Sequence, residues 1–398
     1  MLLTRRGFAL ASAGALTSGL AHPARAAAEP IRVGFLAALT GPASGPTRVG
    51  LQPGVEISVE DINAAGGVLG RKIELITRDT QSDPTKAVNA AQELITSQKV
   101  HVMVGPLNSG ETLAATPILA RAKMPDFHPC YVDSLVDPVK YPNSFRVGPR
   151  SGQLDEAVRN YVLNVAKIRD IAVMGDITGY GTSAVASSVA GFKAGGANVV
   201  YQSQIDATQP NVKPDLLRAQ AAGAKYVVLW TVSAELLARL MNTRAEIGWD
   251  VPFIGHPSLG SGEVRKLLDK PTNWEKVYTL GFRSCAYNAA GKLPPRTEAF
   301  VARLREKKVD LSDTVLFYIL NGYDLIQLPM AGIKGAGGTD AAGIVKYLNT
   351  LQNGWTSLSA TYKFSPTEHN GLPTDQIVMV AANSVKDGAY NLAPGYSS

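Results

Sequence analysis

Short apolar runs alternate with segments of helical periodicity through the first 230 residues of the chain. Residues 31–36 (IRVGFL) have the length and composition of a buried strand, and residues 54–64 place apolar side chains on one helical face. Strands are predicted at residues 31–36, 71–78, 99–104, 169–174, 198–202 and 225–230, and helices at residues 54–64, 83–95, 183–194 and 213–223. This alternation predicts an α/β fold with mainly parallel sheets flanked by helices.

The same order of elements occurs twice, in residues 31–105 and again in residues 169–230. The repetition predicts two similar Rossmann-like lobes, with residues 145–149 crossing between them. Beyond residue 252 the pattern is weaker, and it predicts a strand at 277–282 and helices at 297–307, 314–330 and 341–350. The glycine-rich residues 335–338 follow no predicted strand, so they predict a flexible turn and not a nucleotide-binding loop.

Residues 99–118 contain the first candidate binding site. A predicted strand ends at Gly105-Pro106, and a predicted helix follows a polar loop formed by Leu107, Asn108, Ser109 and Gly110. The free backbone N–H groups at the start of such a helix favour a carboxylate or another anion. The alternative is that Ser109 or Asn108 only caps the helix, as these residue types often do.

The first 26 residues are predicted to be an export signal and not part of the fold. Thr4-Arg5-Arg6-Gly7-Phe8, a short apolar run and Ala24-Arg25-Ala26 are typical of a twin-arginine signal that is cleaved after Ala26. We therefore expect a periplasmic protein. Loss of Arg5, Arg6 and Arg25 lowers the formal charge from +6 to +3, which is too weak to indicate nucleic-acid binding.

The cysteines and histidines predict no metal centre and no cofactor. The five histidines are scattered, and none has the spacing of a metal-ligand pair. Cys130 and Cys285 could form a disulfide in an oxidising compartment, although their separation in sequence does not decide it.

Five segments occur in a distinctive order along the chain: IRVGFLAALTGP, DINAAGGVLGRKIEL, RDTQSDPTKAVNAAQELI, VGPLNSGET and SFRVGP. Together they resemble the leucine/isoleucine/valine-binding proteins, the type I periplasmic solute-binding proteins of ABC importers. The resemblance implies two lobes joined by three hinge crossings, which we place at residues 29–147 plus 281–357 and residues 148–280 plus 358–398. It also implies a small-molecule ligand, an inner-membrane ABC permease as partner, a monomer and no enzymatic activity.

The resemblance assigns binding roles to individual residues of this chain. The family's anchor serine falls on Ser109, and its closing tyrosine on Tyr180. The second anchor loop, usually Ser-Pro-Ala-Ala-Thr, here contains Cys130 and Tyr131, and Val132 replaces the threonine that helps to grip the ligand. The family's disulfide cysteines correspond to Ser82 and Asn108, so the resemblance implies that this bridge is absent.

Two family positions that grip an amino acid are not preserved. The aromatic position corresponds roughly to Val232, and the acidic residue that pairs with the ligand's ammonium falls near Pro257. Because a buried ammonium without acceptors is costly, we expect a small organic acid that lacks an α-ammonium. Side chains that could contribute to its binding are Arg48, by a contact to the carboxylate, and Tyr131, Tyr180, Trp230 and Tyr318, by a flat lining for an aromatic ring.

Three alternatives remain open at this point. The ligand could be a branched-chain amino acid whose ammonium is held by Thr231, Ser233 or Ser258. Ser109 could be the nucleophile of a hydrolase with His128 as its base, although a GxSxG motif is missing. The protein could also be a sensor module that does not take part in transport.

Overall fold

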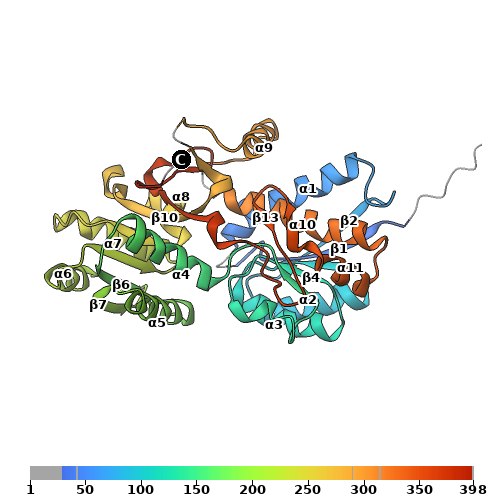
Figure 1. Cartoon of the computed structure of the whole chain (residues 1–398), viewed down its shortest axis with the longest axis horizontal. Helices are drawn as coiled ribbons and strands as arrows, with labels where there is room; N and C mark the ends of the chain where they lie inside the picture. The colour runs from blue at the N-terminus through green and yellow to red at the C-terminus, as the bar shows by residue number, and fades with distance from the viewer. Residues whose placement is uncertain (1–28, 42–43, 289, 313–314, 397–398) are drawn as a thin grey trace, which may run out of the picture.

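Two mainly parallel sheets occupy opposite halves of an elongated molecule (Figure 1). The structure is a computed structural model, and it describes residues 29–41, 44–288, 290–312 and 315–396. The predicted export signal, residues 1–26, lies outside the described residues. Among the helices of the described part, none is long and apolar enough to cross a membrane.

The first sheet has five parallel strands in the order β2-β1-β3-β4-β5. Apolar side chains of its central strands, such as Val33, Phe35 and Val104, are completely buried because helices cover both faces. The strands are β1 (Ile31–Ala37), β2 (Ile73–Asp79), β3 (Val102–Val104), β4 (Asp126–His128) and β5 (Ser144–Arg146), and the connecting helices are α1 (Gln52–Ala64), α2 (Pro84–Thr96) and α3 (Ser109–Arg121).

The second sheet has six strands in the order β14-β10-β9-β8-β6-β7, of which only β14 runs antiparallel to its neighbour. Its strands are β6 (Asp170–Asp176), β7 (Asn198–Ile205), β8 (Tyr226–Trp230), β9 (Phe253–Gly255), β10 (Val277–Phe282) and β14 (Ile377–Ala381). Its helices are α4 (Ser151–Asn160), α5 (Gly179–Ala194), α6 (Lys213–Ala221), α7 (Ala234–Glu246) and α8 (Gly262–Lys266). The predicted α/β class with two Rossmann-like lobes is therefore confirmed, whereas the residue boundaries of the lobes remain a prediction.

The remaining elements lie mostly in the last quarter of the chain. They are α9 (Pro295–Glu306), α10 (Leu316–Ala336), α11 (Ala341–Leu348) and the short strands β11 (Ala286–Tyr287), β12 (Trp355–Thr356), β13 (Thr361–Tyr362) and β15 (Tyr390–Asn391). Helix α10 packs tightly on α1, since a Cβ atom at Gly54 would lie 1.9 Å from the Ile319 carbonyl oxygen. The pair thus needs glycine at this contact, and it fixes the first turn of α10, which carries Tyr318.

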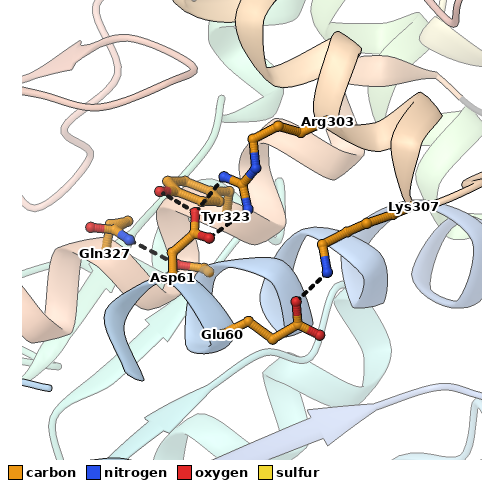
Figure 2. Close-up of polar contacts among 7 residues, drawn as sticks. Glu60, Asp61, Arg303, Lys307, Tyr323 and Gln327 are labelled. Atoms are coloured by element: carbon orange, nitrogen blue, oxygen red, sulfur yellow. Dashed lines mark hydrogen bonds and ion pairs between the residues drawn. The ribbon is translucent and has the colours of Figure 1, made fainter. Parts of the chain in front are cut away.

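Helix α9 is attached to the α1–α10 pair by polar contacts (Figure 2). The Arg303 guanidinium donates to both Asp61 carboxylate oxygens at 2.5 and 2.6 Å, and the Tyr323 hydroxyl donates to Asp61 at 3.1 Å. Lys307, which directly follows the last residue of α9, pairs with Glu60. Helix α1 is thereby joined around one carboxylate to two helices that follow more than 200 residues later in the sequence.

Cys130 and Cys285 are both free, so the disulfide that the sequence left open does not form. Of residues 145–149, Phe145 and Arg146 belong to β5 of the first sheet, and residues 147–149 lead from β5 to α4. One prediction about local structure is wrong. The predicted flexible turn at 335–338 is partly helical, because α10 continues past Pro329 to Ala336 and ends at Gly337, whose φ of +72° suits glycine.

Candidate functional site

The start of α3 presents its first turn without a side-chain cap. Asn108 occupies the N-cap position with extended backbone, yet its side chain accepts no hydrogen bond from the helix and instead donates to Glu111. Ser109 is the first helical residue and is half-buried, while Gly110 is exposed. Neither side chain therefore acts as the cap that the sequence allowed, and the backbone N–H groups of this turn remain suited to an anion.

A buried loop after β4 lies against this helix start. The Cys130 thiol is completely buried, and its Sγ lies 3.5 Å from the Ser109 hydroxyl oxygen. The next residues, Tyr131 and Val132, are half-buried. The structure thus brings together the two anchor segments that the resemblance assigned to ligand binding.

The guanidinium of Arg146 lies behind this loop. Arg146 is completely buried, and it donates to the Val132 carbonyl and, at 3.1 Å, to Asn370 Oδ1. Among the described residues, no carboxylate lies within ion-pair distance of it. Burial lowers the pKa of Arg146 to about 10, so the group is still positive at neutral pH and makes this wall of the site favourable for an anion.

Three tyrosines from separate elements lie close enough for their hydroxyl groups to interact: Tyr131 after β4, Tyr180 in α5 and Tyr318 in α10. Burial raises the pKa of Tyr131, and the neighbouring Tyr318 and Tyr180 hydroxyls raise it further. Burial likewise raises the pKa of Tyr180, again with Tyr318 nearby. Tyr131 Oη is buried and makes no hydrogen bond within the described part of the chain.

In the second lobe, the polar side chains around Asp176 form hydrogen bonds with one another and with nearby backbone groups. Asp176, at the end of β6, accepts a 2.6 Å hydrogen bond from the Thr231 hydroxyl on one oxygen and a 3.0 Å bond from the Thr178 N–H on the other. The Thr231 oxygen in turn accepts the Ser233 N–H at 3.1 Å. Thr231 is only 1% exposed, so its role in the structure is to hold Asp176 and the start of α7.

His256 is a candidate site residue that the sequence analysis did not single out. Its ring lies edge-on to Tyr180 with centroids 5.5 Å apart, and only 4% of the residue is exposed. Burial lowers the pKa of His256 to about 4, although the nearby Asp176 carboxylate acts in the opposite direction. In this loop the sequence analysis named Pro257. The contact between His256 and Tyr180 is formed by the tertiary fold, so no local sequence pattern indicates it.

Several candidates lie outside this arrangement. Val232 is 58% exposed, and Arg48 is exposed on a π-helical turn, Thr47–Leu51. Pro257 is buried, and its carbonyl accepts a hydrogen bond from Thr279. Leu107 packs against the main hydrophobic core. A surface groove of about 770 Å³ beside α11 contains none of the candidate residues.

Two buried carboxylates flank the candidate site. Both Asp176 oxygens accept hydrogen bonds, as described above. Glu111 is 1% exposed; its Oε2 accepts the Asn108 side-chain amide, whereas its Oε1 has no hydrogen-bond partner among the described residues. Burial raises the pKa of Glu111, an effect that Thr80 and Asn108 partly offset. The described residues also contain no cluster of histidine, cysteine or carboxylate side chains that could hold a metal ion.

Comparison with known proteins identifies the family. Residues 30–389 match the family model described as periplasmic binding protein. The Leu/Ile/Val-binding protein homolog 3 of Brucella melitensis is 26% identical over 329 residues, which cover 82% of this chain and 85% of that protein.

Solved structures of similar fold hold different ligands. The branched-chain amino acid binding protein LivJ of Streptococcus pneumoniae, solved with isoleucine, has a TM-score of 0.75 and 20% identity, covering 92% of this chain and 99% of that one. A solute-binding protein of an ABC transporter from Rhodopseudomonas palustris, solved with 3,4-dihydroxybenzoic acid, has a TM-score of 0.72 and 22% identity, covering 92% and 96%. At identities of 20% and 22%, these similarities show a shared fold and do not identify the ligand of this chain. The chain belongs to the periplasmic binding protein family and is a type I member of its leucine/isoleucine/valine-binding group.

Proposed function

We propose that this solute-binding protein captures a small organic acid that lacks an α-ammonium, with an aromatic carboxylate as the favoured class. The acid would be enclosed between the two lobes in the periplasm and delivered to an inner-membrane ABC permease. The carboxylate would bind at the start of α3, where Ser109 and free backbone N–H groups lie against the loop of Cys130 and Val132, to which the buried Arg146 donates. The three tyrosines would enclose the ring.

The observation that carries the proposal is the engagement of the acceptors around Asp176 that could have held an ammonium. The Asp176 carboxylate beside Tyr180 is already bonded on both oxygens, and Thr231 and Ser233 are bonded to Asp176 and to the start of α7. Ser258 contacts the His256 ring at 3.0 Å. An ammonium placed here would have to displace these bonds, and an unpaired buried cation costs several kcal/mol.

A branched-chain amino acid is the second candidate, because the relatives that match most of the chain are named for leucine, isoleucine and valine. Titration calorimetry distinguishes the two candidate ligand classes. The protein is first unfolded and refolded to remove any bound ligand. We expect benzoate or a hydroxybenzoate to bind at least about tenfold tighter than leucine and valine, which corresponds to about 1.4 kcal/mol. Tighter binding of leucine would overturn the proposal.

The contacts of Ser109 give no support to the hydrolase alternative. Its hydroxyl contacts the Cys130 thiol, and both ring nitrogens of His128 are buried without a hydrogen-bond partner among the described residues. Burial and the nearby Arg146 lower the pKa of His128 well below its usual value. A general base within reach of Ser109 is therefore not provided by this histidine.

We further propose export through the twin-arginine pathway with cleavage after Ala26. The mass of the periplasmic protein tests this, since a mature chain that begins elsewhere would contradict it.

A further inference from the structure

We propose that the Nε2–H group of His256 selects the ligand by donating a hydrogen bond to an oxygen at the end remote from the carboxylate. The ligand class then narrows to aromatic acids that carry a hydroxyl or carbonyl oxygen on the ring. This inference rests on the proposed function, because it assigns the second end of the same site.

The backbone around His256 is fixed on both sides. At the preceding Gly255 φ is +147°, and a Cβ there would lie 2.2 Å from the Leu229 carbonyl oxygen, so the bend depends on glycine. The His256 N–H donates to that carbonyl at 3.1 Å, and the His256 carbonyl accepts from the Thr279 hydroxyl at 3.0 Å. The imidazole therefore projects from an anchored position.

The hydrogen bonds of the ring define where its proton lies. The Ser258 N–H donates to Nδ1 at 3.1 Å, so Nδ1 is an acceptor and carries no proton. With its pKa lowered to about 4, the ring is neutral at pH 7, and its single proton is on Nε2. Nε2 has no hydrogen-bond partner within the part of the chain that the structure describes. A fixed, unused donor is thus available beside Tyr180.

A series of contacts connects this donor to the carboxylate end. Ser109 contacts Cys130, the adjoining Tyr131 lies near Tyr318 and Tyr180, and Tyr180 packs against His256. A flat ligand held between the tyrosines would present one end to Ser109 and the other to His256. The Nε2–H group can donate a hydrogen bond to an oxygen acceptor of the ligand. It cannot bind an ammonium, because an ammonium is itself only a donor.

Calorimetry with a matched set of ligands and variants tests the assignment. Benzoate, 3-hydroxybenzoate and 4-hydroxybenzoate are titrated into the wild-type protein, His256→Phe, His256→Gln and the control His369→Gln. His369 suits as a control because it is also a buried neutral histidine, but it bonds Ser144 and Asn349 beside the first sheet.

We expect the wild type to bind one of the hydroxybenzoates about tenfold or more tighter than benzoate, as a hydrogen bond between buried partners provides. His256→Phe should reduce that ratio to below about threefold, His256→Gln should keep part of it by its amide N–H, and His369→Gln should leave it unchanged. An equal ratio in the wild type and His256→Phe would overturn the assignment.

Resonances of the ¹⁵N-labelled wild-type histidines provide a measurement that needs no variant. The hydroxybenzoate should shift the His256 Nε2–H proton downfield relative to benzoate, and identical shifts would contradict the assignment. Failure of all three acids to bind while leucine binds would overturn the proposed function itself. Tight binding of benzoate with no preference for a hydroxyl would overturn only the role of His256.

Discussion

Tyr180 is the residue of the second lobe on which the proposed site depends most. It stands beside His256 and near Tyr131 and Tyr318. We predict that Tyr180→Ala weakens the binding of the preferred acid by about 1–3 kcal/mol, since an aromatic contact and a hydrogen bond are both lost. Titration calorimetry measures this change. Tyr201→Ala, at a tyrosine of β7 that bonds Asp215, should leave the affinity unchanged, and equal losses in both variants would place the site elsewhere.

The protonation of His256 also affects stability. Its pKa is about 4 in the folded protein and about 6.5 in an unfolded chain, so the unfolded state binds the proton more readily between these values. The contribution of the neutral ring is complete above pH 6.5 and is lost as the pH falls toward 4. Between pH 7 and pH 5 the loss amounts to about 2 kcal/mol.

We therefore predict that the difference in unfolding free energy between the wild type and His256→Gln changes by about 2 kcal/mol over this range, because glutamine does not titrate. Urea unfolding at pH 7, 6 and 5 measures it. Other buried groups titrate equally in both proteins and cancel in the difference. A difference that stays constant with pH would show that the pKa of His256 is not lowered.

Single residues also show how far the sequence could specify the site. Ser109 and Tyr180 could be named because each stands at a fixed place in a motif, after a strand or at the start of a helix. Thr231 was a reasonable ligand candidate by its position, but its hydroxyl is bonded to Asp176, which is 55 residues away in sequence. His256 was missed for the same reason, since its neighbour Tyr180 is brought to it by the fold.

Among the secondary-structure elements, those with strong periodicity or clear capping signals were predicted well. Helix α2 begins after Asp83, whose carboxylate accepts the Thr85 and Lys86 N–H groups, as the Asp-Pro-Thr sequence indicates. Helix α4 was not predicted, because Arg150 stands at its N-cap in place of a capping hydroxyl or carboxylate. Strands β4 and β5 have three residues each, too short for a period to be recognised.

The attachment of α9 provides a test at this scale. Asp61 has a side chain 26% exposed, and it accepts bonds from Arg303 and Tyr323. We predict that Asp61→Ala lowers the free energy of unfolding by about 1–2 kcal/mol, because both partners lose their acceptor. Urea denaturation measures the loss.

The exposed pair of Asp250 and Lys276 is the matched control, since the Asp250 side chain is 79% exposed. Asp250→Ala should change the unfolding free energy by less than about 0.5 kcal/mol. Similar losses in the two variants would mean that the contacts of α9 in Figure 2 contribute no more than an ordinary surface ion pair.

For the whole molecule, the proposed site draws residues from both lobes, so a ligand should favour the conformation in which they approach. We predict that the preferred acid decreases the radius of gyration in small-angle X-ray scattering. Ser109→Ala at the same acid concentration should contract less, because its carboxylate contact is weakened. A radius that does not respond in the wild type would contradict closure around this ligand.

The order in which the lobes are completed along the chain has a consequence for biosynthesis. The core of the first sheet, with Phe35 and Val104, includes Leu316 and Leu320 of α10, and β14 of the second sheet is formed by residues 377–381. A nascent chain that has passed residue 146 contains all five strands of the first sheet but lacks the helix that packs on it. Both lobes thus expose apolar surface until α10 and β14 have been synthesised, and chains truncated before α10 should aggregate.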